Sequence, residues 1–139
     1  MYIFAEVKIE VEGAREHFYK LVVDGKCLID EFWNTTRKDG NYEDDLDKVQ
    51  VIIEKMSKGE PIPPKLFKEL SGRKKNDPVK DYEIEVKKIR IYLFKFEKVG
   101  KIVVLGALKD PKEQLSDIQQ MRRLKRAYID SKSQKNRKA

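Results

Sequence analysis

The chain of 139 residues has little of what several common kinds of site require. Cys27 is the only cysteine and His17 the only histidine, so neither a disulfide framework nor a mechanism with two histidines can form within one chain. We expect no metal site and no cofactor, because one cysteine and scattered carboxylates do not make a ligand set. The reducing cytoplasm is the simplest location for such a sequence.

Long hydrophobic runs are also missing. Apolar runs such as 91–94 and 102–105 hold four residues, whereas a membrane-spanning helix needs about 20. The first residues lack the basic and apolar regions of a signal peptide, so we expect no secretion and no membrane partner. The patterns G-x-x-x-x-G-K-[ST], G-x-G-x-x-G, H-E-x-x-H and G-x-S-x-G are absent. Nucleotide-binding, metalloprotease and serine-hydrolase readings therefore lack sequence support.

Positive charge is abundant but uneven. The net charge is +7, yet residues 1–64 carry nine Lys and Arg against 14 Asp and Glu, a net charge of −5. Residues 65–139 carry the other 22 cations against 10 carboxylates, a net charge of +12. A basic excess of this size in half a small chain favours a polyanionic partner such as RNA, DNA or the ribosome.

Hydrophobic periodicity predicts two strands and two helices in the acidic half. Residues 2–12 alternate, with Ile3, Val7 and Ile9 on a face that should be buried. Leu46 and Ile53 belong to an apolar stripe at helical spacing. The predicted elements are strands at 2–12 and 18–23, and helices at 27–35 and 43–58, with a loop at 37–42.

The basic half should add three strands and a helix. The strands are predicted at 81–86, 89–96 and 101–108, and their short spacers force antiparallel hairpins. Asp110, Pro111 and Glu113 fit the start of a helix, from which Arg122 and Lys125 should project outward. The fold class is thus α+β, with an antiparallel sheet packed on one face against helices and a C-terminal helix.

One domain is expected over residues 1–130, because neither half has enough apolar residues for its own core. The residues expected to be buried together are Trp33, Leu46, Val49, Ile53, Leu93 and Val103. Residues 131–139 are polar and basic, which predicts a disordered tail.

After these exclusions, the side chains that could take part in binding or catalysis are the Lys and Arg residues of the basic half. Cleavage of RNA by its own 2′-hydroxyl needs a base, stabilisation of a pentavalent phosphate and an acid for the leaving oxygen. Arginine suits the phosphate because its fork matches two oxygens. Lysine can act as the base only where burial or neighbouring cations lower its pKa from about 10.4. The same cations could instead bind phosphate without cleaving RNA.

Four segments occur in an order and spacing that resemble the RelE/HigB toxins of bacterial type II toxin–antitoxin systems, in the RelE/ParE superfamily. They correspond to the family patterns F-K-x-L, Y-E-[LI]-R, Y-R-[IV]-x-[YF] and F-x-K-K, and are residues 65–70, 81–85, 89–94 and 102–109. The resemblance covers residues 18–130 and leaves the strand at 2–12 as an N-terminal addition. It implies a RelE-like fold and a metal-independent endoribonuclease that cuts mRNA on the ribosome. It also implies a small antitoxin protein as partner.

The resemblance assigns residues to roles, on an open face of the sheet. The catalytic candidates are Arg90 as phosphate clamp and Lys65, Lys68 and Lys109 as proton-transfer groups. Further RNA contacts are expected from Lys87, Lys88, Lys112, Arg122 and Arg126. Two positions depart from the family, since Glu85 and Asp110 stand where it has basic residues, and Glu85 could pair with Arg90 and hold it away from phosphate. A non-catalytic RNA- or protein-binding module and a gyrase-poisoning relative stay open as alternatives, and the sequence does not indicate an oligomeric state.

Overall fold

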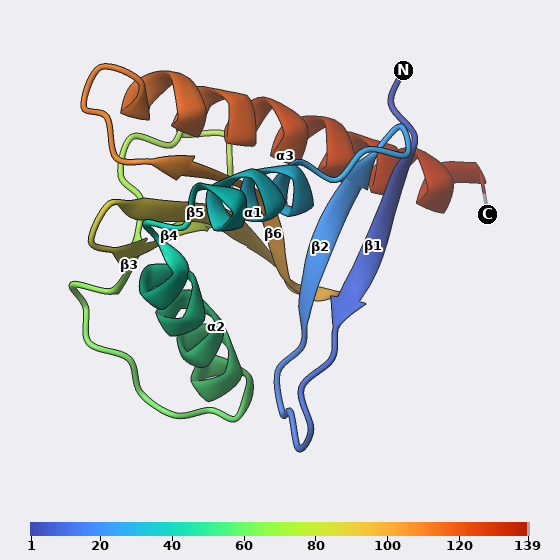
Figure 1. Ribbon diagram of the computed structural model, residues 1–139. Helices are drawn as coiled ribbons and strands as arrows, with labels where there is room; N and C mark the ends of the chain where they lie inside the picture. Colours follow the sequence, from blue (N-terminus) through green and yellow to red (C-terminus); the bar gives the residue numbers. More distant parts are fainter. Residues whose placement is uncertain (139) are drawn as a thin grey trace.

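The computed structural model describes the backbone of residues 1–138 and the side chains of residues 1–133, and its fold is α+β (Figure 1). In chain order the elements are β1 (Phe4–Ile9), β2 (Phe18–Val23), α1 (Leu28–Asp39), α2 (Glu43–Ser57), β3 (Phe67–Glu69), β4 (Asp81–Val86), β5 (Ile89–Phe96), β6 (Gly100–Leu108) and α3 (Gln114–Lys138). The predicted order of strands and helices is confirmed, with the three-residue strand β3 as an addition.

The strands form one mixed sheet in the order β1-β2-β6-β5-β4-β3. Antiparallel pairing is confirmed for β4, β5 and β6, as the short spacers predict. The expectation of a wholly antiparallel sheet is wrong, because β2 and β6 run parallel with Tyr19 opposite Ile102. These two strands are separated by two helices and three strands, so no short turn fixes their relative direction.

Helices cover both faces of the sheet rather than the one face predicted (Figure 1). On one face, Ile53 of α2 shares a buried cluster with Ile91 of β5. On the other face, the ring of Tyr128 of α3 lies 5.6 Å from that of Phe94 of β5. Alternate residues of β5 therefore enter two cores. A strand covered on both faces explains why residues 91–94 form an uninterrupted apolar run.

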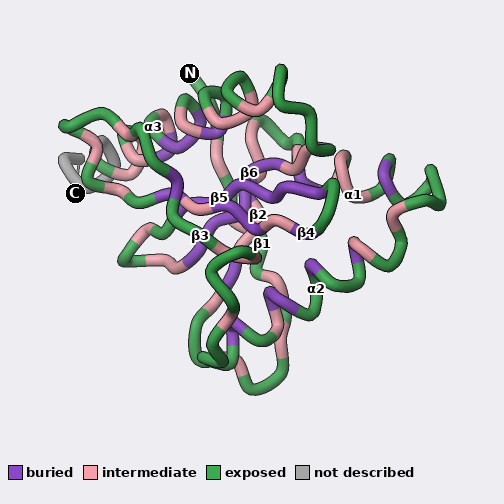
Figure 2. The backbone as a smooth tube through the Cα atoms, turned by 90° about the vertical axis from the view of Figure 1, so that its left-hand side faces the viewer, coloured by how far each residue is buried: buried purple, intermediate pink, exposed green. Residues whose placement is uncertain are grey.

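Buried residues concentrate in the middle of the sheet (Figure 2). The predicted core is confirmed for Leu46, Val49, Ile53, Leu93 and Val103, each no more than 8% exposed. Trp33 is only half-buried and packs at the edge of this cluster.

The predicted buried face of β1 is confirmed only at the end of the strand, where Ile9 packs against the core. Phe4 and Glu6 point toward α3, where the ring of Phe4 lies 5.7 Å from that of Tyr128. The rest of the apolar face is open, with Ile3 76% and Val7 45% exposed. Periodicity identifies an apolar face but cannot supply an element to cover it.

Two helices extend beyond their predicted ends. Helix α1 continues to Asp39, where Gly40 adopts a left-handed conformation (φ 82°) and donates its N–H to the Arg37 carbonyl. Helix α3 runs to Lys138, so the tail predicted to be disordered is helical up to that residue. Residues 131–138 lack Gly and Pro, which lets the helix propagate. Within residues 1–138, no helix has both the length and the apolar composition needed to cross a membrane.

Candidate functional site

The candidate site is built on the β4–β5 hairpin, on the face of the sheet that α3 covers. The two-residue turn at 87–88 sets a register in which Glu85 lies opposite Arg90 and Glu83 opposite Tyr92. Directly opposed residues project to the same side of a sheet. The two carboxylates, the guanidinium and the phenol therefore share one face.

Arg90 is the centre of an ion-pair network with both carboxylates. Its Nη1 lies 2.6 Å from Glu83 Oε1, and its Nη2 lies 3.7 Å from Glu85 Oε2. The side chain of Glu83 is only 1% exposed and that of Arg90 10% exposed. Burial would lower the pKa of Arg90, but the Glu83 hydrogen bond and both carboxylates hold that pKa above its usual value. The expectation that Arg90 lies on an open face is wrong.

Two lysines reach the same carboxylates from neighbouring strands. Lys68 of β3 places Nζ 3.0 Å from Glu85 Oε1 and 3.6 Å from Glu83 Oε2. Lys109, just after β6, places Nζ 3.6 Å from Glu85 Oε2, and its backbone N–H donates to the Lys88 carbonyl. We call Lys68, Glu83, Glu85, Arg90 and Lys109 the charge cluster.

Glu85 receives three cations and is the most accessible carboxylate of the charge cluster. Its side chain is 20% exposed, and those of Lys68 and Lys109 are each 46% exposed. Burial would raise the pKa of Glu85, but the Lys68 hydrogen bond and the charges of Arg90, Lys68 and Lys109 leave it below its usual value. Glu85 raises the pKa of Lys68 in turn. A lysine base requires a lowered pKa, so the structure argues against Lys68 in that role.

Beneath this outer layer lie buried polar atoms with unused hydrogen-bonding capacity. Within residues 1–133, Glu83 Oε2, Arg90 Nε and Tyr92 Oη have no hydrogen-bond partner. Burial raises the pKa of Tyr92, as does the charge of Glu83. The floor of the charge cluster thus combines a carboxylate, a guanidinium and a neutral phenol.

The other predicted site residues do not join the charge cluster. Lys65 lies exposed in the turn before β3, and Lys88 and Lys112 are exposed on neighbouring turns. Lys87 pairs with Asp45 of α2 at 3.8 Å, and Arg126 is 56% exposed. Of the four catalytic candidates, the structure brings together Lys68, Arg90 and Lys109.

Arg122 and Lys125 point inward, so the expectation that they project outward is wrong. Arg122 Nε lies 2.9 Å from Asp81 Oδ2, and Nη2 donates to the Ser71 carbonyl. Lys125, 1% exposed, places Nζ 2.7 Å from both Asp81 and Asp77. Buried charges need such partners. These ion pairs hold α3 against β4. Because Arg122 takes part in them, it is not free to contact RNA.

Glu83 is the functional candidate that sequence reasoning missed. The signal was the hairpin register, because the two-residue spacer at 87–88 already places Glu83 and Glu85 on the face of Arg90. A strand that alternates acidic and apolar residues, paired with a strand that carries an arginine, predicts ion pairs across the hairpin.

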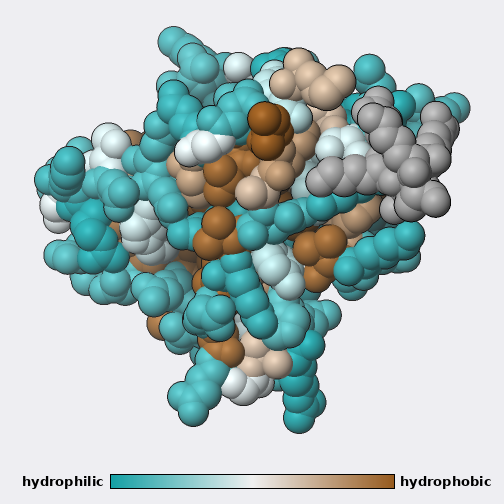
Figure 3. Space-filling model, turned by 90° about the vertical axis from the view of Figure 1, so that its right-hand side faces the viewer, coloured by the Kyte–Doolittle hydropathy of each residue, from teal (hydrophilic) through white to brown (hydrophobic). Residues whose placement is uncertain are grey.

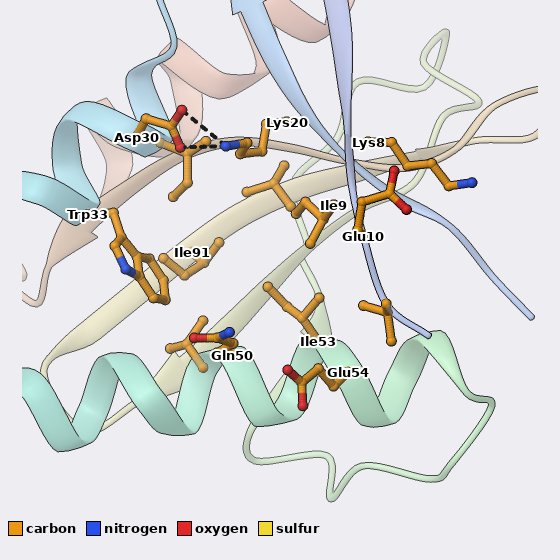
Figure 4. Close-up of a pocket in the computed structure, with 14 residues that line it drawn as sticks. Lys8, Ile9, Glu10, Lys20, Asp30, Trp33, Gln50, Ile53, Glu54 and Ile91 are labelled. Atoms are coloured by element: carbon orange, nitrogen blue, oxygen red, sulfur yellow. Dashed lines mark hydrogen bonds and ion pairs between the residues drawn. The ribbon is translucent and has the colours of Figure 1, made fainter. Parts of the chain in front are cut away.

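A cleft of about 400 Å³ lies on the opposite face, between the β1–β2 hairpin and helices α1 and α2 (Figure 4). Trp33, Ile53 and Ile91 line it, and an ion pair of 2.9 Å between Lys20 and Asp30 stands beside them. The cleft and the charge cluster are separated by the sheet and do not form one site.

No protein-family model, curated protein or solved structure matches the chain. The function of the charge cluster is therefore inferred from its geometry and charge. The cluster offers an ionised carboxylate within ion-pair distance of three cations and open to solvent on one side. Such a set can bind a phosphate and exchange a proton beside it.

Proposed function

We propose that the chain is a RelE/HigB-like toxin with a RelE-like fold, acting as an mRNA endoribonuclease on the ribosome. The observation that carries the proposal is the convergence of Lys68, Arg90 and Lys109 on Glu85 from three separate elements. The location expected for this activity is the cytoplasm, and the partner expected to neutralise it is a small antitoxin protein that covers the charge cluster.

The proposed chemistry uses the chain's own groups. Glu85, ionised at neutral pH, removes the proton from a ribose 2′-hydroxyl, and the 2′-oxygen then attacks the adjacent phosphorus. Arg90 and Lys68 stabilise the negative charge that develops on the phosphate oxygens. As the bond from phosphorus to the 5′-oxygen breaks, the leaving oxygen takes a proton from the ammonium of Lys109. The products are a 2′,3′-cyclic phosphate and a 5′-hydroxyl.

The charge distribution supports an RNA substrate. Residues 65–139, with a net charge of +12, form β3 to β6 and α3, which surround the charge cluster. Lys88 and Lys112 are exposed in this part of the chain, as are Lys87 and Arg126, whose ion pairs of 3.8 Å lie at the surface. A polyanion would gain affinity from each phosphate contact with these residues through release of counterions.

A specific observation favours a second function, a non-catalytic RNA-binding module. The guanidinium of Arg90 is buried and held by Glu83 at 2.6 Å, which limits its freedom to reach a phosphate. In that case the exposed lysines would bind RNA and the buried pair would only stabilise the hairpin.

The test is cleavage of a defined mRNA on programmed ribosomes, with free mRNA in parallel and mapping of the 5′ ends. We expect ribosome-dependent cuts by the wild type, and a loss of at least about 100-fold for Glu85→Gln, as for removal of a general base. Lys109→Ala should also lose activity, whereas Lys80→Ala, an exposed lysine outside the charge cluster, should not. RNA binding without any cut, in both wild type and Glu85→Gln, would replace the nuclease with the binding module.

A further inference from the structure

Strand β1 ends the sheet with an unpaired edge whose outward groups can be identified. The N–H of Ile3 donates to Asp24 Oδ1 and its carbonyl accepts the Asp24 N–H, each at 2.8 Å. The backbone of Ile3 therefore faces β2. Since successive residues alternate in direction, the N–H and C=O groups of Phe4, Glu6 and Lys8 point away from the sheet.

The opposite edge of the sheet is shorter. Strand β3 is only three residues long, and a very short edge strand is a common means of preventing edge-to-edge pairing. Strand β1 is twice as long, and Figure 3, which views this side, shows apolar side chains among hydrophilic ones. Ile3 and Val7 contribute to that apolar surface. Unpaired backbone N–H and C=O groups beside exposed apolar side chains indicate a site at which another strand can pair.

We propose that two copies of the chain pair through β1, antiparallel, about a two-fold axis at Val7, forming one continuous sheet of twelve strands. Hydrogen bonding between the copies requires that outward-facing residues oppose one another, so even-numbered residues must pair with even-numbered ones. A two-fold axis at Val7 meets this condition. It places Glu6 opposite Lys8 of the other copy twice, once on each side of the axis.

The apolar face is equally self-complementary in this register. Val7 meets Val7, Ala5 meets Ile9, and Ile3 meets Val11 of the other copy. Ile3, Ala5 and Val7 are exposed in the single chain, whereas Ile9 and Val11 are half-buried and Ile9 packs against the core. The alternation that predicts a buried face in the sequence is thereby satisfied in the dimer.

The registers with the two-fold axis one residue away from Val7 are disfavoured, because they oppose like charges. An axis at Glu6 would place two carboxylates directly opposite, and an axis at Lys8 would place two ammonium groups opposite. Like charges opposed across a strand pair are destabilising. Lys8 makes no ion pair with the residues that the structure describes, so it is available for Glu6 of the second copy.

Helix α3 ends beside the same edge. The helix crosses the sheet from Asp81 of β4 to Glu6 of β1, where Lys132 Nζ lies 2.8 Å from Glu6. Its backbone continues for about 9 Å after Lys132, past β1 (Figure 1). The end of α3 therefore lies next to the edge that the second copy would occupy.

The first experiment measures the mass of the full chain by light scattering across a range of concentrations. We expect a species of twice 16.4 kDa for the wild type. Lys8→Glu should weaken the dimer at least tenfold, because it opposes Glu6 with a carboxylate. Lys48→Glu makes the same change of charge on an exposed position of α2 and should leave the dimer intact. A wild type that stays at 16.4 kDa would overturn the proposal.

The second experiment tests the register by disulfide trapping in a Cys27→Ser background. Across a non-hydrogen-bonded pair the Cα atoms lie about 4.5 Å apart, which suits a disulfide. Val7→Cys should therefore cross-link under mild oxidation. Ala5→Cys is the matched control, since the two Ala5 positions would lie about 14 Å apart, four residues along the strand and one strand spacing across. Equal cross-linking of both variants would refute the axis at Val7, and neither readout depends on nuclease activity.

Discussion

At the scale of single residues, Arg90 is predicted to be essential for stability as well as for the proposed chemistry. In Arg90→Ala the carboxylate of Glu83, 1% exposed, would lose its partner at 2.6 Å. Removing one member of a buried pair costs about 3–5 kcal/mol in the free energy of unfolding. Urea denaturation should show this loss, and Lys68→Ala, with a half-exposed side chain, should cost no more than about 1 kcal/mol. Equal losses in both variants would contradict the burial argument.

Asp117, in the first turn of α3, is predicted to destabilise the fold when it ionises. Burial raises its pKa, as do the charges of Glu113 and Asp110. A carboxyl whose pKa is raised by folding costs stability above that pKa and costs nothing below the pKa of the unfolded chain. Asp117→Asn should therefore raise the free energy of unfolding at pH 7, by about 0.5 kcal/mol, and the gain should vanish near pH 3. Asp130→Asn, exposed on the same helix, is the control, and an equal gain of Asp117→Asn at both pH values would refute the prediction.

At the scale of elements, the buried Lys125 is predicted to contribute strongly to the attachment of α3. Lys125 joins Asp77 and Asp81 and is 1% exposed, whereas Arg126, the next residue, is 56% exposed and pairs with Asp130 at 3.8 Å. Lys125→Ala should cost about 3 kcal/mol or more and speed hydrogen exchange in α3. Arg126→Ala should cost less than about 0.5 kcal/mol. Comparable exchange in both variants would mean that apolar contacts alone hold the helix.

The packing of α1 on β6 requires the absence of a side chain at Gly106. A Cβ atom there would lie 2.4 Å from a ring carbon of Phe32, closer than any real contact. Gly106→Ala should therefore lower the free energy of unfolding by about 1–3 kcal/mol. Phe32→Leu removes the clashing ring atoms, so the double variant should be less destabilised than the sum of the two single variants. Strict additivity in thermal or urea unfolding would show that the clash relaxes elsewhere.

Local elements were predictable from the sequence, and long-range relations were not. Periodicity and short spacers predicted the order of elements and the β4–β5–β6 hairpins, because both are properties of neighbouring residues. The parallel pairing of β2 with β6 joins segments far apart in the chain, which no turn constrains. Strand β3 is too short for a periodic signal. The exposure of the apolar residues of β1 was not predicted, because an alternating pattern of apolar and polar residues does not show what covers the apolar face.

The candidate site was predictable to a similar degree. The cations Lys68, Arg90 and Lys109 were identified, and so was Glu85 as a partner of Arg90, which the structure confirms at 3.7 Å. Glu83 was missed, although the hairpin register places it on the same face as Arg90. Burial was the missing information, since a lysine base is reasonable beside other cations and unreasonable beside Glu85, which raises its pKa.

At the scale of the whole molecule, the uneven charge of the sequence places basic and acidic residues on different elements. The basic half of the chain forms β3 to β6 and α3, and the acidic half forms β1, β2, α1 and α2. Several basic residues are already neutralised, since Arg90, Arg122 and Lys125 each pair with a carboxylate. The number of cations free to bind phosphate is therefore well below the 22 in the sequence. Salt dependence of RNA binding measures that number directly.

We expect the affinity for single-stranded RNA to fall steeply with salt. Each phosphate contact contributes about −0.7 to the slope of log K against log salt concentration, so five contacts give about −3.5. Lys112→Ala, in the basic half, should reduce the magnitude of the slope by about 0.7, whereas Lys48→Ala, exposed on α2, should not change it. Arg122→Ala is the sharper comparison, because Arg122 is held by Asp81 and Ser71 and should leave the slope unchanged while destabilising α3. A slope near zero for the wild type would remove RNA as the partner of the basic half.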